Sequence, residues 1–109
     1  MMLPDAERAR VERSKVVEYL LSASHPDGHS KAAFFMRFGF RVEAWQLLAE
    51  ALRATGTSYP VTSVVEGARG KRYTVDGPIQ APDGRAPTIR TVWIVADGAP
   101  PRLITAYPL

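Results

Sequence analysis

Residues 88–107 of the chain read TIRTVWIVADGAPPRLITAY, and this stretch decides the fold. Its two runs rich in β-branched and aromatic residues, Thr88–Val95 and Arg102–Tyr107, are separated by Asp97-Gly98 and two prolines. β-Branched and aromatic side chains favour strands, and an Asp-Gly pair favours a tight turn between antiparallel strands. The stretch therefore predicts a β-hairpin.

The residues before this hairpin extend it into a larger sheet. Val61–Glu66 and Lys71–Val75 are also rich in Val, Thr and Tyr, and they flank the turn sequence Gly67-Ala68-Arg69-Gly70. A longer segment that contains Gly77-Pro78 and Pro82-Asp83-Gly84 leads on to the hairpin. Because short turns join most successive strands, we predict an antiparallel meander of four strands.

The first half of the chain has helical character. Apolar residues recur at helical spacing in about Ser14–Ser22, His29–Phe38 and Arg41–Thr55, and Gly56 is expected to end the third helix. Residues 1–13 are expected to form an N-terminal arm or helical leader. The predicted fold is α+β: about three N-terminal helices pack on a four-stranded antiparallel sheet, in a single domain of residues 14–109.

Composition excludes several classes of protein. Of the 109 residues, 46% are hydrophobic and 23% are charged, which is typical of a globular domain. The absence of cysteine excludes disulfide-linked partners, thiolate zinc sites and a cysteine nucleophile. The sequence starts without the basic and apolar regions of a signal peptide and has no apolar run of membrane-spanning length, so we expect a cytoplasmic protein with no membrane partner.

The net charge of +3 arises in the predicted sheet. Residues 1–68 contain eight Lys or Arg and eight Asp or Glu, whereas residues 69–109 contain six Lys or Arg and three Asp or Glu. A basic excess on one structural element suits a polyanionic partner. An ordinary solvated surface is the alternative, because exposed charges are common on any protein.

Alternation of side chains along a strand divides the last two strands into two faces. We expect the helices to cover the face formed by Val92, Ile94, Ile104 and Ala106. The open face of the sheet is then expected to carry Thr91, Trp93, Thr105 and Tyr107.

Two histidines, His25 and His29, flank the turn Pro26-Asp27-Gly28. A metal site needs at least three convergent ligands, and the chain has no third histidine and no cysteine, so we predict neither a metal nor another cofactor. His29 and Lys31 open the second helix, where backbone N–H groups attract anions. A lysine there is unfavourable unless an anion lies nearby, although a solvent-exposed Lys31 is an equally simple interpretation.

Polar side chains of the predicted sheet complete the candidate set. Arg72 and Arg90 can each bind a phosphate through two N–H groups at once. Trp93 and Tyr107 offer rings on which a nucleobase can stack, although strand aromatics more often pack in a core.

Two longer patterns resemble a bacterial family. The first runs from Tyr19-Leu20-Leu21 through HPDGHSKAAFF at residues 25–35 to Phe38-Gly39-Phe40, and the second combines TVWIV at residues 91–95 with PRLITAYP at residues 101–108. Together they resemble a family of unknown function whose members occur alone and as C-terminal modules of adhesin-like polymorphic toxins. The layout of helices before sheet, and the closing Thr-Ala-Tyr-Pro strand, also resemble the barnase/EndoU/colicin/RelE group of metal-independent ribonuclease toxins.

The resemblance implies RNA cleavage without a metal ion. The predicted catalytic residues are His29, Lys31, Arg90, Thr105 and Tyr107. The predicted substrate-binding residues are His25, Arg72, Thr91 and Trp93. On this hypothesis a histidine acts as acid or base, the cations hold phosphate, and the hydroxyls position the substrate. Several of those toxins have a histidine in the sheet, but the sheet half of this chain has none. Which of His25 and His29 acts as acid or base therefore stays open.

The candidate partners are RNA and a cognate antitoxin or immunity protein. The alternative function is a non-catalytic protein-binding module, either the immunity or antitoxin half of a pair or an accessory domain that uses its sheet edge. A small-ligand site between helices and sheet is a third alternative, which no residue pattern supports specifically.

Overall fold

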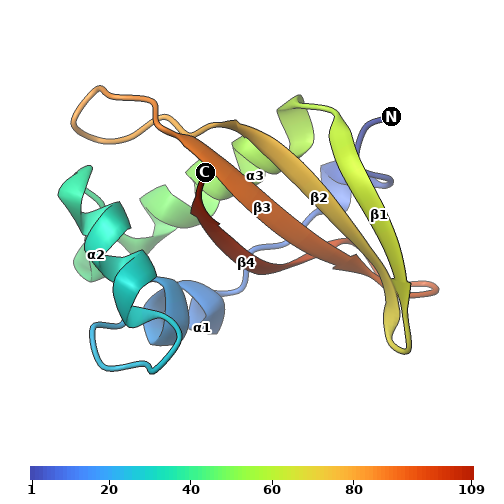
Figure 1. Cartoon of the computed structure of the whole chain (residues 1–109), viewed down its shortest axis with the longest axis horizontal. Helices are drawn as coiled ribbons and strands as arrows, with labels where there is room; N and C mark the ends of the chain where they lie inside the picture. Colours follow the sequence, from blue (N-terminus) through green and yellow to red (C-terminus); the bar gives the residue numbers. More distant parts are fainter.

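The computed structural model describes residues 1–109. Its elements in chain order are η1 (Ala6–Arg8), α1 (Arg13–Lys15), η2 (Val16–Leu20), α2 (His29–Arg37), η3 (Val42–Ala44), α3 (Trp45–Ser58), β1 (Val61–Gly67), β2 (Gly70–Pro78), β3 (Thr88–Val95) and β4 (Arg102–Pro108). The strands form one antiparallel sheet in the order β1-β2-β3-β4. The helices pack on it as Figure 1 shows, with α3 behind the sheet and α1 and α2 beside β4. The predicted α+β fold is confirmed.

The predicted helices differ from the observed ones in detail. The first consists of a single α-helical turn, α1, that continues as the π-helical turn η2, where the Leu21 N–H donates to the Val16 carbonyl at 2.8 Å. The third begins with the 3₁₀ turn η3 and continues to Ser58. The prediction that Gly56 ends this helix was wrong.

Gly56 has a packing role inside α3. A Cβ atom at this position would lie 2.2 Å from Cζ2 of Trp93, on the neighbouring strand β3. No real Cβ comes that close to a buried ring, so only glycine lets α3 approach the sheet at this point. The glycine that looks like a helix stop in the sequence is therefore a contact between the two layers.

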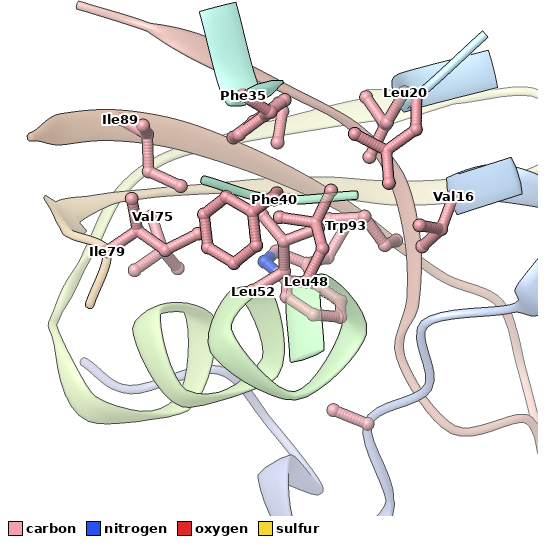
Figure 2. Close-up of a cluster of buried hydrophobic side chains, with 14 of the residues drawn as sticks. Val16, Leu20, Phe35, Phe40, Leu48, Leu52, Val75, Ile79, Ile89 and Trp93 are labelled. Atoms are coloured by element: carbon pink, nitrogen blue, oxygen red, sulfur yellow. The ribbon is translucent and has the colours of Figure 1, made fainter. Parts of the chain in front are cut away.

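The core lies between the helices and one face of the sheet. Figure 2 shows Leu48 and Leu52 of α3 together with Phe40 around Trp93. All four side chains are at most 2% exposed. Trp93 is the largest of the buried side chains, and the core is therefore organised around it.

Thr91 and Trp93 lie on the helix-covered face, and their predicted placement on the open face was wrong. Both are fully buried. The Trp93 Nε1–H donates to Thr91 Oγ1 at 2.9 Å, and the Thr91 hydroxyl donates to the Val75 carbonyl at 2.8 Å. Because the threonine supplies the partner that the indole N–H needs, the polar tip of the tryptophan can be buried without an unpaired donor.

The prediction that the helices bury the aliphatic residues of β3 was wrong as well. Val92 and Ile94 are half-buried residues of the open face, although both were predicted under the helices. Ile104 was also predicted there, and it lies at a β-bulge: Val92 pairs with Thr105, whereas Trp93 pairs with Leu103. Of the four aliphatic residues assigned to the covered face, only Ala106 is fully buried.

The bulge resets the alternation of β4. One extra residue in a strand moves every following side chain to the other face. Leu103 and Ala106 are consequently both buried, while Arg102, Thr105 and Tyr107 pair with residues of the open face. Strict alternation would have separated Arg102 from Thr105 and Tyr107.

The first thirteen residues lie against the domain. Leu3 and Ala9 belong to the buried cluster. The Arg53 guanidinium donates to the carbonyls of Glu7 at 2.8 Å and of Ala9 at 3.1 Å, and the backbone at Arg10 bonds to the residues on either side of Arg102. None of the helices has the length and hydropathy that a membrane span requires.

Replacement of Gly56 by alanine tests the contact with Trp93. Glycine to alanine in a helix interior ordinarily stabilises a protein, by up to about 1 kcal/mol. We expect the reverse for Gly56→Ala, a loss of about 1–3 kcal/mol, because the added methyl overlaps a buried ring that has no room to move. Urea denaturation measures the change. The exposed Gln46→Ala in the same helix should shift stability by less than about 0.5 kcal/mol, and a Gly56→Ala protein more stable than wild type would contradict the close approach.

Candidate functional site

The open face of the sheet carries polar and charged side chains from three strands. Cross-strand pairing arranges them in three rows, which are Arg72–Ile94–Arg102, Thr74–Val92–Thr105 and Asp76–Arg90–Tyr107. The opposite face is apolar where the helices cover it, apart from buried, hydrogen-bonded groups, and it carries one exposed ion pair, Lys71 with Glu66. The polar chemistry of the sheet is therefore concentrated on one side.

Arg90 is held in place by Asp76. Its Nε–H donates to Asp76 Oδ1 at 2.8 Å and its Nη2 donates to Oδ2 at 2.9 Å, which is a bidentate pair between neighbouring strands. The Asp76 carboxylate raises the pKa of Arg90 above its already high ordinary value, and the Tyr107 hydroxyl adds to this effect. A guanidinium has five N–H groups, so three remain for the Tyr107 hydroxyl and a ligand.

Tyr19 of η2 connects the open face to the segment that carries the histidines. Its hydroxyl lies 2.9 Å from Thr105 Oγ1, although the two residues are 86 positions apart. The Nζ atoms of Lys15 and Lys31 lie 5.2 Å and 5.4 Å from the centre of its ring. The His25 ring packs edge-on against it, with 5.0 Å between ring centres.

The hydrogen bonds of the two histidines give them different roles. His25 Nδ1 accepts the N–H groups of Asp27 and Gly28 at 2.9 Å and 3.0 Å, so this nitrogen is unprotonated in the neutral ring and Nε2 carries the proton. His29 Nδ1 lies 3.1 Å from the His25 carbonyl oxygen, which can only accept, so here Nδ1 carries the proton. Neutral His29 is left with a free lone pair on Nε2, as a general base requires.

Lys31 points back toward the preceding loop. Its Nζ donates to the Asp27 carbonyl at 3.0 Å while it also lies over the Tyr19 ring. This arrangement satisfies one of the three N–H groups of the ammonium and holds the cation beside the histidine turn.

The structure brings most of the predicted residues to one region and separates two of them from it. Arg72, Arg90, Thr105 and Tyr107 share the open face, and Tyr19 joins His25 and Lys31 to its β4 edge. His29 follows His25 by one helical turn and bonds to its carbonyl. Thr91 and Trp93 are buried on the other face and take no part in this surface.

Sequence reasoning missed Tyr19, Asp76, Lys15 and Arg102. The sequence did not indicate Asp76, because the long loop before β3 leaves open which residues of β2 and β3 pair. The structure pairs Asp76 with Arg90. Tyr19 stands in one of the family patterns, but its role depends on Thr105, which is distant in sequence. No cluster of three or more His, Asp or Glu side chains is arranged to hold a metal ion.

The chain is a small α+β domain, and the open face of its sheet carries several cations. The model of the family described as "Domain of unknown function (DUF6883)" matches residues 2–109, and the chain belongs to that family. No curated protein matches it.

A solved structure has a similar fold. It is the contact-dependent growth inhibition toxin–immunity protein complex from Klebsiella pneumoniae 342. One of its chains aligns with a TM-score of 0.72 and 20% sequence identity, over 91% of this chain and 98% of that chain. At this level of identity the comparison shows a shared fold.

The Tyr19–Thr105 contact can be tested as a stability element. A net hydrogen bond between side chains contributes about 1 kcal/mol, so Tyr19→Phe and Thr105→Val should each lower the free energy of unfolding by about this amount. The double variant should lose little more than either single one, because both changes remove the same bond. Tyr59→Phe is the matched control, since no hydrogen bond of that hydroxyl is present. Fully additive losses in urea denaturation would show that the two residues are not coupled.

Proposed function

We propose that this chain is a toxin domain that cleaves RNA with its own side chains as catalysts. The observation that carries the proposal is the arrangement of the open face, where Arg90, Thr105 and Tyr107 lie together. The Tyr19–Thr105 hydrogen bond ties this face to the turn with His25 and His29. Cations, hydroxyls and imidazoles are the groups that phosphodiester cleavage by acid–base catalysis uses.

The comparison with a toxin–immunity complex supports the same class. That complex contains a toxin and its immunity protein, and the shared fold is compatible with either role. The basic excess of the sheet half favours the toxin, because a nuclease must attract a polyanion. Resemblance to the metal-independent ribonuclease toxins points the same way.

The proposed reaction is transfer of the phosphodiester to the neighbouring 2′-oxygen. His29 Nε2 takes the proton of the ribose 2′-OH, the 2′-oxygen bonds to phosphorus, and the bond from phosphorus to the 5′-oxygen breaks. The leaving 5′-oxygen takes its proton from water, because His25 Nδ1 accepts two backbone N–H groups and the neutral ring that this requires is not an acid. The products are a 2′,3′-cyclic phosphate and a 5′-hydroxyl end.

The cations stabilise the charge that builds on the phosphate oxygens. Arg90 offers the N–H groups that Asp76 leaves free, and Lys31 offers a second positive charge beside the histidine turn. Thr105 and Tyr107 are assigned to positioning the substrate, and Arg72 to binding it. A cognate immunity or antitoxin protein would inhibit the enzyme by covering this face.

Growth inhibition in bacteria tests the proposal. Tightly induced wild-type chain should stop growth and produce RNA fragments with 5′-hydroxyl and cyclic phosphate ends. His29→Ala should lower cleavage about 10²–10⁴-fold because the base is lost, and Arg90→Ala about 10²–10³-fold because a charge-stabilising donor is lost. Arg37→Ala, which removes an exposed cation of α2, is the control and should remain toxic.

Two results would overturn the proposal. Full toxicity of both His29→Ala and Arg90→Ala would remove the assigned site. Normal growth and intact RNA with a folded wild-type protein would remove the nuclease activity and favour the second candidate.

The second candidate is a non-catalytic protein-binding module, and strand β1 favours it. β1 is an edge strand whose residues are almost all exposed, including Val64 at 44% and Val65 at 58%. An exposed edge with apolar side chains can accept a strand from a partner. Stable pairing with an immunity or toxin partner, without any toxicity, would support this function.

A further inference from the structure

A basic pocket lies at one end of the open face. Its volume is about 440 Å³. It lies where the β1–β2 turn and the β3–β4 turn come to the same end of the sheet (Figure 1). The side chains that matter here are four cations and two aliphatic residues, which are Lys15, Arg69, Arg72, Arg102, Ile94 and Ile104.

The four cations come from four separate segments and have little compensating charge. The single carboxylate contact is from Glu12 to Arg102, at 3.7 Å between half-exposed side chains, and such a surface pair is weak. Lys15, Arg69 and Arg72 make no ion pair. Converging like charges repel one another, so the arrangement suits an anion between them.

Two features of the fold create this convergence. The β4 bulge brings Arg102 to the open face, in the same row as Arg72 and Ile94. Lys15 reaches the pocket from α1 and also lies over the Tyr19 ring, whose hydroxyl contacts Thr105. Lys15 therefore links the pocket to the candidate site, because it lines the pocket and contacts Tyr19.

The lining suits a nucleotide rather than a simple ion. Guanidinium groups bind phosphate oxygens, while the aliphatic side chains of Ile94 and Ile104 offer an apolar surface for a base or sugar. Arg72 lies four residues from Asp76 along β2, which corresponds to roughly 13 Å at the usual rise of a strand. A short single strand can contact both the pocket and the Arg90 row at that separation.

We propose that this pocket binds the phosphate backbone of single-stranded RNA next to the cleaved bond. The inference rests on the proposed ribonuclease function, and it adds Arg69 and Arg102 to Arg72, which that function already assigns to substrate binding. Arg69, Arg72 and Arg102 hold phosphate groups there, and the pocket fixes which stretch of the strand lies across Arg90.

Binding of an uncleavable oligonucleotide tests the subsite separately from catalysis. The probe is a fluorescent, single-stranded 2′-O-methyl RNA, which lacks the hydroxyl that the proposed reaction needs. Arg69→Gln and Arg72→Gln should each weaken binding about tenfold, equivalent to about 1.4 kcal/mol, and lower the salt dependence by about one phosphate contact. The measurement is fluorescence anisotropy of the full chain over a range of salt concentrations.

Lys71→Gln is the matched control. It removes the same charge from the adjacent position of β2, where the side chain points to the other face and lies 3.6 Å from Glu66. Affinity and salt dependence should stay at the wild-type values. Urea denaturation of the three variants confirms that each is folded.

The outcomes separate the two proposals. Loss of binding in Arg72→Gln but not in Lys71→Gln supports the subsite, even if the wild type cleaves no RNA and the proposed function fails. Equal effects of the two changes overturn the subsite even if the wild type cleaves RNA. Absence of oligonucleotide binding at low salt also overturns it, and binding of an acidic protein at the same residues would then identify a different partner.

Discussion

The indole of Trp93 lies fully buried between β3 and α3, with its N–H bonded to Thr91 and its ring against Gly56. Each of these contacts has a physical cause: an unpaired buried donor is costly, and a large ring needs a neighbour without a side chain. Because the tryptophan occupies the covered face, its neighbours in the strand, Val92 and Ile94, are left on the open side. This one side chain decides which face of β3 is buried, and β2, which pairs with β3 without a register shift, follows it.

The bulge at Ile104 makes the candidate surface. Without the extra residue, a strand that buries Leu103 would bury Thr105 and Tyr107 as well. With it, Leu103 and Ala106 both pack in the core while Arg102, Thr105 and Tyr107 pair along the open face. The bulge thus allows β4 to bury apolar side chains in the core and to place its cation and hydroxyls on the open face.

Tyr19 connects polar residues of the helical half to the open face of the sheet. Lys15 and Lys31 lie over its ring, His25 packs against it in a T-shaped arrangement, and its hydroxyl reaches Thr105. The helical segment and the sheet therefore share one polar region at the β4 edge. The basic pocket, the Arg90–Asp76 pair and the histidine turn are connected through the residues around it.

The sequence by itself determined the order and type of the elements, since these depend on local patterns. Runs of β-branched residues, the turn sequences around Gly67 and Asp97, and helical spacing of apolar residues each act within a few positions. The same reasoning found Arg90, Thr105, Tyr107 and the histidines as polar residues in suggestive places. Only the tertiary structure decided which face each strand presents, because that choice depends on Trp93 fitting against Gly56, on the bulge, and on a hydrogen bond between residues 86 positions apart. These are non-local packing constraints, and the alternation of side chains along β3 allows either face to be buried.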